Sequence, residues 1–281
     1  QRQMCIRDRE CFYMLIARPS IDLRPFVKQY WGIESCTPPK SSYDIKIIPT
    51  GLIELNFYLG CKPACSDTNH IIAENSIING QQKSPYNICI SEKLFMFSVT
   101  FQPEGAMFFF DLPLQEIFNA TIPLREIFKN EIEALEQKLY MASDFNTRCS
   151  VMNNFLYHLL VRNYNHPDYK RMTNCIEIIN QQNGNSDIEN LASYACWSRK
   201  QLERSFQKYI GSTPKHFLRL VRFQHVLFAK QLNEELSMTQ LAYLGGYFDQ
   251  SHLNAEFKAL TDLTPKKYFT ICDPQSDYFT F

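Results

Sequence analysis

This sequence of 281 residues lacks several features that define large classes of protein. No apolar run comes near the roughly 18 residues that a membrane-spanning helix needs, which argues against an integral membrane protein. Residues 1–10 are polar and charged, without the apolar core of a signal peptide. Lysine plus arginine equals aspartate plus glutamate at 29 each, so neither sign of charge dominates the chain. We therefore expect a cytoplasmic protein with no membrane contact.

Histidine is scarce where a metal enzyme would need it, since only His70 of the six falls in the region expected to be β-rich. A cupin-type centre would need several on adjacent strands. The ten cysteines, without a secretory signal, indicate reduced thiols rather than a disulfide framework. Zinc takes four nitrogen or sulfur ligands, and one set could supply them: Cys36, Cys61, Cys65 and Cys89. The usual close C-x2-C pair is absent, which favours buried or loop cysteines. We predict no enzymatic activity, metal or cofactor.

What the chain does have is an internal repeat near its C-terminus, at an offset of 50 to 51 residues. The recurring elements are Leu191-Ala192 as Leu241-Ala242, Leu202 as Leu253, Phe206 as Phe257, Thr213-Pro214 as Thr264-Pro265, and Phe217 as Tyr268. The second copy carries one extra residue in its turn, near 245–247. Repeated apolar anchors at helical spacing indicate one supersecondary unit built twice.

Each copy predicts two short helices joined by a tight turn. In the first copy, apolar residues at 188, 191, 192 and 195 share one helical face. Ser198-x-x-Gln201 then has the form of a capping box that starts a second helix, and Gly211 ends that helix. In the second copy, Gly245-Gly246 forms the turn and Asp249 is the expected cap. This is the helix-turn-helix pattern, whose second helix can lie in a DNA major groove.

The outward faces of the two predicted second helices are polar. They carry Lys200, Glu203, Arg204, Gln207 and Lys208 in the first copy, and Gln250, Ser251, Asn254 and Lys258 in the second. Arginine and lysine suit guanine edges or phosphates, whereas asparagine and glutamine suit adenine edges. Residues 196–230 hold eight lysines or arginines against one acid. Such a local excess indicates a polyanion site, with a solvated helical face as the alternative.

Residues 171–272 resemble the DNA-binding domain of the AraC/XylS family of bacterial transcription activators and repressors. The matching elements are Leu191-Ala192, Ser198-x3-Leu202-x-Arg204-x-Phe206, Gly211-x-Thr213-Pro214, Arg222, Leu241-Ala242, Gly246-Tyr247, Asp249-Gln250-Ser251, Phe257-Lys258 and Thr264-Pro265-x2-Tyr268. The resemblance implies seven helices, with a long central helix that places two helix-turn-helix units on successive major-groove segments.

By this resemblance, base readers in one segment would be Lys200, Glu203 and Arg204, and in the next Gln250, Ser251 and Asn254. We assign the DNA interface to these residues together with Ser198, Arg199, Gln201, Gln207, Lys208, Arg222 and Lys258. The chain departs from the family pattern at two positions. Ala255 stands where many members carry arginine, and Asp262 replaces the glycine that corresponds to Gly211. We therefore expect the second reading helix to be weak or mostly positional.

Thr213-Pro214 predicts the start of the linking helix, because threonine can cap it and proline is tolerated at the first helical position. The helix should run to about Leu232, a length of roughly 27 Å. Its apolar surface toward both units is assigned to Phe217, Leu218, Val221, Phe228 and Leu232.

Residues 11–112 are predicted to be mainly β, with a hairpin in 45–59 around Pro49-Thr50-Gly51 and further β segments in 75–80 and 87–101. Helices are expected over 114–118, 124–128, 132–141 and 145–161. A looser resemblance links about residues 20–130 to an uncharacterised N-terminal domain often fused to AraC-type DNA readers. It rests on Thr100-Phe101-x-Pro103-x-Gly105-Ala106, Leu112-Pro113 and Pro123-Leu124.

In this family the N-terminal part commonly binds a small effector, dimerises, or does both. An apolar pocket or an ordinary core could be formed by Phe95, Phe97, Phe101, Phe108, Phe109 and Phe110. The helix at 145–161 has a wide apolar stripe of Phe145, Cys149, Met152, Phe155, Leu156, Leu159 and Leu160. This stripe could pair with its copy in a homodimer or pack on its own domain.

The sequence thus predicts an α+β chain. Residues 1–10 are a non-native or disordered start, and 11–162 form a β-rich sensing or dimerisation domain with trailing helices, for which a barrel is one option. A linker at 163–170 leads to an all-α DNA-binding domain at 171–272 and a tail at 273–281. We expect a sequence-specific transcription regulator with double-stranded DNA, RNA polymerase and a small effector as partners. The alternatives are a cysteine-based alkyl-acceptor repair regulator and a nonspecific architectural DNA binder.

Overall fold

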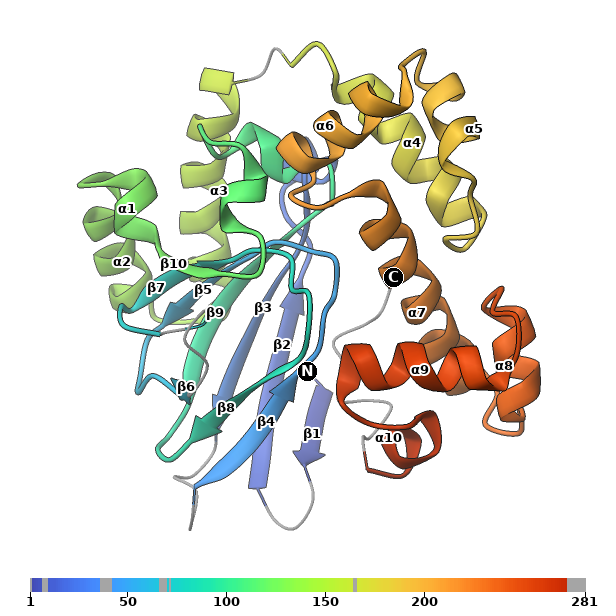
Figure 1. Ribbon diagram of the computed structural model, residues 1–281. Helices are drawn as coiled ribbons and strands as arrows, with labels where there is room; N and C mark the ends of the chain where they lie inside the picture. The colour runs from blue at the N-terminus through green and yellow to red at the C-terminus, as the bar shows by residue number, and fades with distance from the viewer. Residues whose placement is uncertain are drawn as a thin grey trace.

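The computed structural model describes residues 2–6, 10–35, 42–65, 70, 72–163 and 166–271. A β-rich N-terminal part and a helical C-terminal part lie side by side (Figure 1), so the chain is α+β as predicted. Residues 2–6, within the start that we expected to be non-native or disordered, pair as a strand with residues 10–14. The tail at 273–281 lies outside the described residues.

Two open antiparallel sheets make up the β-rich part. The larger has the order β1 (Arg2–Ile6), β2 (Glu10–Ala17), β3 (Val27–Ser35), β9 (Phe95–Phe101), β5 (Glu54–Tyr58), β7 (Ser76–Asn79) and β10 (Thr121–Pro123). The smaller has the order β4 (Tyr43–Ile47), β8 (Tyr86–Ile90) and β6 (Ala64–Cys65). Within the described ranges, the outer strands of each sheet do not pair with each other, so the barrel that we considered does not close.

The prediction of a β-hairpin in residues 45–59 is wrong. β4 pairs with β8, whereas β5 pairs with β7 and β9, so the two strands belong to different sheets. The connection between them packs against the helical part instead, where Ile48 is buried and Gly51 lies against Leu220. Alternating polarity predicts strands, but it does not say which strands pair.

Over the described residues, three α-helices and three 3₁₀ turns complete the N-terminal part. They are η1 (Ile21–Leu23), η2 (Ala106–Phe108), η3 (Leu114–Ile117), α1 (Leu124–Phe128), α2 (Glu131–Met141) and α3 (Phe145–Asn163). The three α-helices and the last 3₁₀ turn lie near the predicted positions, and the first two 3₁₀ turns were not predicted. The apolar stripe of α3 is buried in the core of its own domain, including Met152 and Leu156 at 0% exposure. The stripe is therefore not available for pairing with a second copy.

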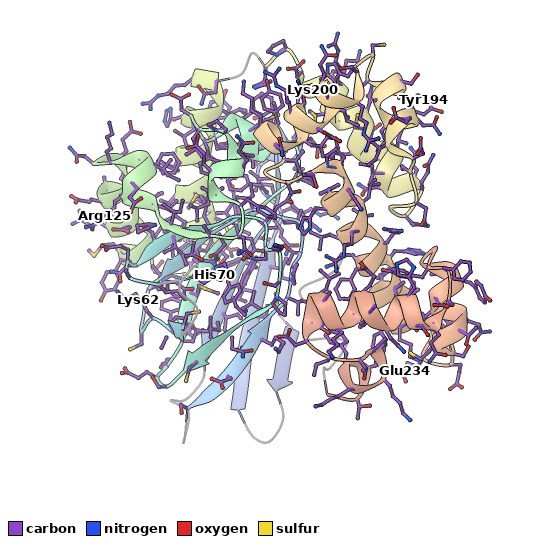
Figure 2. The ribbon with its side chains drawn as sticks, viewed as in Figure 1. Lys62, His70, Arg125, Tyr194, Lys200 and Glu234 are labelled. Atoms are coloured by element: carbon purple, nitrogen blue, oxygen red, sulfur yellow. The ribbon has the colours of Figure 1, made fainter. Side chains whose placement is uncertain are left out.

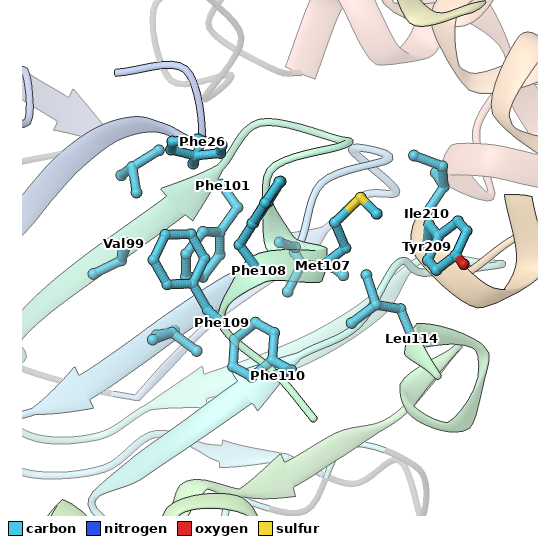
Figure 3. Close-up of a cluster of buried hydrophobic side chains, with 14 of the residues drawn as sticks. Phe26, Val99, Phe101, Met107, Phe108, Phe109, Phe110, Leu114, Tyr209 and Ile210 are labelled. Atoms are coloured by element: carbon cyan, nitrogen blue, oxygen red, sulfur yellow. The ribbon is translucent and has the colours of Figure 1, made fainter. Parts of the chain in front are cut away.

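Five of the six phenylalanines that we considered as a pocket lining belong to one buried core, and four of them are labelled in Figure 3. The rings of Phe101 and Phe109 lie 5.0 Å apart, and Phe26 meets Phe108 edge to face at 4.6 Å. Only Phe95 among the six is partly exposed. The ring contacts are those of a packed core.

The helical part has the seven helices that the resemblance implied, counted over the described residues. They are α4 (Tyr169–Gln181), α5 (Ile188–Tyr194), α6 (Arg199–Tyr209), α7 (Pro214–Leu232), α8 (Met238–Leu244), α9 (Gln250–Thr261) and α10 (Pro265–Ile271). The predicted linker at 163–170 overlaps the last residue of α3 and the first two of α4. The domain boundaries themselves stay predictions.

One hydrophobic core runs from the β-rich part into the helical part. Leu114 of η3 and Tyr209 and Ile210 at the end of α6 belong to the same buried cluster as the phenylalanines (Figure 3). Helix α6 therefore rests directly on the N-terminal part, and the two parts bury apolar surface jointly.

Polar contacts cross the same junction. The Gln224 side chain of α7 donates to the Pro49 carbonyl at 3.2 Å, and His216 Nε2 lies 3.2 Å from the Gln82 carbonyl oxygen. Burial lowers the pKa of His216, which favours the neutral ring. Since buried polar groups are costly unless bonded, these contacts fix the register of α7 against the N-terminal part.

Glu104, in the turn after β9, is a buried carboxyl group near the junction. Burial is the main cause that raises the pKa of Glu104 to about 7, and the negative charge of Glu177 on α4 adds to it. Within the described part of the chain, Glu104 Oε2 has no hydrogen-bond partner. The folded state therefore binds a proton more tightly here than the unfolded chain does.

We expect the free energy of unfolding to fall as the pH rises from 4.5 to about 7. In this window the carboxyl group of Glu104 ionises in the unfolded chain but stays protonated in the folded protein. This difference lowers the free energy of unfolding by up to about 3 kcal/mol. Glu104→Gln should flatten that part of the profile, measured by urea unfolding between about pH 4 and 8. Glu116→Gln, at an exposed acid of η3, is the matched control. A Glu104→Gln profile that superimposes on the wild type would contradict the assignment.

Candidate nucleic-acid interface

The sequence repeat is also a repeat of backbone geometry. α5–α6 and α8–α9 each form a helix-turn-helix unit, and their left-handed residues recur at matching positions. Cys196 at φ +53° corresponds to Gly246 at +69°, and Gly211 at +94° corresponds to Asp262 at +60°. Aspartate is among the few residues that tolerate this region. The replacement of glycine by Asp262 therefore preserves the turn.

The predicted caps are present. Ser198 and Gln201 form a reciprocal capping box, in which the Ser198 backbone N–H donates to Gln201 Oε1 at 2.8 Å. Asp249 accepts from the backbone N–H of His252 at 2.7 Å and starts α9. Sequence reasoning missed a second capping box, Ser237-x-x-Gln240 at α8, although the same S-x-x-Q signal marks it. Ser198 and Gln201, both assigned to the interface, are thus already engaged in fixing where α6 begins.

The first reading helix, α6, has a buried side and a positively charged side. The buried side is formed by Leu202, Phe206 and Tyr209. The exposed side carries Lys200, Arg204 and Lys208 one turn apart, with Glu203 and Gln207 half-buried beside them. Lys200 lies at the outer surface in Figure 2. The residues predicted to read DNA therefore share one accessible face.

Arg199 begins α6 within a small ion-pair network. It lies 3.1 Å from Glu189 and 3.3 Å from Glu203. Exposed pairs of this kind contribute about 1 kcal/mol or less. A phosphate could therefore displace these carboxylates from Arg199.

A cleft of about 590 Å³ is lined by residues of α6, of η3 and of the start of α4. Arg171, Arg204 and Lys208 bring three positive charges to its walls. The acid beside them, Asp168, accepts a hydrogen bond from the Tyr209 hydroxyl at 3.1 Å. Arg171 extends the positive face of α6, and sequence reasoning missed it because it lies ahead of the repeat.

The second reading helix, α9, buries the same positions and exposes different chemistry. Leu253, Phe257 and Leu260 are fully buried. Of the predicted readers, Gln250, Ser251 and Lys258 are exposed and Asn254 is half-buried. Lys258 is the one lysine or arginine of α9, whereas α6 carries four, Arg199, Lys200, Arg204 and Lys208.

Helix α7 joins the two units and is buried on more than one side. Its buried residues are Pro214, Phe217, Leu218, Leu220, Phe223, Gln224, Val226 and Leu227. One apolar assignment to this helix is wrong, since Leu232 is 71% exposed, whereas Val221 and Phe228 are half-buried. Because the two helix-turn-helix units pack against different faces of α7, its buried residues do not lie on a single face of the helix.

Arg222 of α7 faces the turn of the second unit. Its guanidinium lies 5.7 Å from the centre of the Tyr247 ring, which is itself 3% exposed. Arg222 is half-buried, whereas the cations of α6 are exposed. In this structure Arg222 therefore contacts the turn between α8 and α9 through the Tyr247 ring.

α6 and α9 lie at opposite ends of α7 (Figure 1). Both helices run toward the β-rich part from their N-terminal to their C-terminal ends. The end of α6 contacts η3, where Gly211 lies against Leu114. The end of α9 contacts β4, where Asp262 pairs with Lys46 at 2.8 Å. Both helices thus direct their C-terminal ends toward the N-terminal part and their capped starts away from it.

Residues 191–271 match the family model described as a helix-turn-helix domain, and residues 16–123 match a domain of unknown function, DUF6597. The C-terminal part of this chain is an AraC-type helix-turn-helix domain. The resemblance of the N-terminal region to an uncharacterised domain is confirmed as well.

Relatives of the AraC-type domain are themselves named as regulators. An uncharacterized HTH-type transcriptional regulator of Haemophilus influenzae is 34% identical over 101 residues, 36% of this chain and 34% of that protein. The regulator GbdR of Pseudomonas aeruginosa is 33% identical over 85 residues, 28% of this chain and 22% of that protein. The match thus spans about a third of the Haemophilus relative. Among solved structures, ToxT from Vibrio cholerae aligns over 92% of this chain and 98% of its own, at 10% identity and a TM-score of 0.49.

The cysteines considered for zinc are not assembled. The pairing of β6 with β8 places Cys65 and Cys89 on opposite faces of the small sheet. The Cys61 thiol donates to Glu92 Oε2 at 2.6 Å, and Cys36 lies outside the described residues. Over the part of the chain that the structure describes, no group of three or more histidine, cysteine or acidic residues could hold a metal.

The same described residues include no helix both long and apolar enough to cross a membrane.

Two substitutions on α6, one at a buried and one at an exposed position, should differ in their effect on the free energy of unfolding. Leu202 is fully buried, so Leu202→Ala should lower the free energy of unfolding by about 2–5 kcal/mol through a core cavity. Arg204→Ala should change it by about 0.5 kcal/mol or less, because the side chain is exposed. Urea unfolding followed by circular dichroism measures both. A comparable loss in the two variants would show that Arg204 belongs to the fold rather than to the reading face.

Proposed function

We propose that this protein is a sequence-specific DNA-binding regulator of bacterial transcription that reads two successive major-groove segments with α6 and α9. The observation that carries the proposal is the pair of capped reading helices at the two ends of α7. A helix of 19 residues is about 28 Å long. That length approaches the roughly 34 Å of one DNA turn, so the two helices are spaced for neighbouring groove segments.

The exposed side chains support a division between base reading and phosphate contact. In this proposal Lys200, Glu203 and Arg204 read bases in one segment, and Gln250, Ser251 and Asn254 read the next. Lys208 contacts a phosphate near the end of α6. Arginine can bond guanine in two places, while lysine acts as a point charge on phosphate.

The remaining partners follow from the same role. We propose that the protein acts in the cytoplasm without enzymatic activity and that RNA polymerase is its downstream partner. A small effector would act through the N-terminal part, although the phenylalanine cluster is filled core. A homodimer would need a surface other than the buried stripe of α3.

Selection of bound sites from a random DNA pool tests the proposal directly. A regulator should prefer its selected site over random duplex by about 10³-fold or more, whereas a nonspecific architectural binder would hardly discriminate. The log of the affinity should also fall with the log of the salt concentration, by about 0.9 per phosphate neutralised. Stoichiometric zinc, and loss of DNA repair on changing Cys61 or Cys65, would instead favour the alkyl-acceptor alternative.

A pair of substitutions on α6 should separate the two kinds of contact. Arg204→Ala should relax base preference at positions within one half of the site, at about 1–3 kcal/mol for the preferred base. Lys208→Ala should weaken binding to all sequences alike and reduce the salt slope by about one. Fluorescence anisotropy with single-base variants of the site gives both quantities. Equal effects of the two substitutions on every sequence would contradict the assigned reading face.

A further inference from the structure

The two reading helices differ in chemistry at matching positions of the repeat. The offset of 51 residues pairs Lys200 with Ser251 and Arg204 with Ala255. All four residues are exposed. Where α6 presents two cations, α9 presents a hydroxyl and a methyl group. A difference at the centre of the reading face means that the two helices cannot select the same bases.

Phe248 adds an exposed apolar ring directly before the cap of α9. It lies where the second copy has one residue more than the first, between buried Tyr247 and the cap Asp249. Its side chain is 86% exposed, the highest value for a large apolar side chain among the described residues. The ring therefore gains little from folding, which is unusual for a group that water disfavours.

The position of Phe248 is fixed by the turn rather than left free. Gly246 adopts φ +69°, and a Cβ atom on Gly245 would lie 2.4 Å from Val226 of α7, so both glycines are required by the geometry. The backbone N–H of Phe248 lies 3.4 Å from His252 Nδ1 in the first turn of α9. The turn thus holds an exposed phenylalanine directly before the helix that enters the groove.

We propose that the second reading helix recognises thymine through its 5-methyl group, with Phe248 as the main contact and Ala255 as the second. This inference rests on the proposed function. In the major groove thymine presents a methyl group that phenylalanine and alanine contact, whereas guanine is most often read by arginine or lysine, which α9 lacks at these positions. The half-site read by α9 is accordingly rich in thymine, and the half-site read by α6 carries guanine.

Replacement of thymine by deoxyuridine in the selected site tests this directly, because it removes the methyl group and leaves the pairing edge intact. With the full-length protein, each contacted methyl removed from the second half-site should weaken binding about fourfold. Replacements in the first half-site should have little effect. Fluorescence anisotropy at fixed salt gives the dissociation constants.

Phe248→Ala should weaken binding to the thymine site and abolish most of the difference between thymine and deoxyuridine. Leu232→Ala is the matched control, since Leu232 is also an exposed apolar residue and lies at the end of α7. It should retain the wild-type methyl dependence. Thermal unfolding should confirm that both variants stay folded.

Three results would overturn the inference. The wild type could bind deoxyuridine and thymine sites equally, Phe248→Ala could keep the full methyl dependence, or Phe248→Ala could lose the same factor on both sites. Each of these leaves sequence-specific binding intact, so the proposed function would stand. A protein that shows no preference for any selected site would instead refute the proposed function itself.

Discussion

Helix α7 imposes the constraint on which the rest of the structure depends, because it closes two hydrophobic cores at once. Phe217 and Leu218 belong to the core that runs from the β-rich part through α6, and Phe223 belongs to the core formed with α8, α9 and α10. Helices as short as α5 and α8 are unstable alone and gain their order from packing. Neither reading helix would hold a fixed orientation without α7. The spacing between the two is therefore a property of one rod.

The N-terminal part also packs against α7. Ile48 enters the second core, Pro49 accepts a hydrogen bond from Gln224, and Gly51 lies against Leu220. All three positions belong to the connection between β4 and β5, which leaves its own sheets to make these contacts. A displacement of this connection would change the packing of α7 before it changed either reading helix. The β-rich part is thus a structural component of the reader and shares its cores.

Local chemistry made the helical part predictable from the sequence. Ser198, Thr213 and Asp249 were expected as caps and do cap their helices, because a capping side chain bonds only to residues two or three positions away. The β-rich part was predicted less well, since the alternation around Pro49 indicates strands but not their partners, and its two strands join different sheets. On α7, the assignment of Leu232 to the apolar surface was wrong, since this last residue of the helix is 71% exposed. The core that the β-rich and helical parts share was not predicted, because no local sequence pattern indicates it.

The chain also shows how a protein of zero net charge can present a site for a polyanion. Cations are gathered on α6 and at Arg171, while the surface of α9 has Lys258 and several neutral groups. A cation on phosphate adds affinity for every sequence and makes binding sensitive to salt. Neutral side chains add little to nonspecific affinity, so their contacts contribute mainly to the difference between one base and another. In the proposed role, placing the charge at one end of α7 would let electrostatic attraction bring the duplex to α6. Helix α7 would then set where α9 meets the next groove segment, so that the second helix would discriminate between bases without contributing much general affinity.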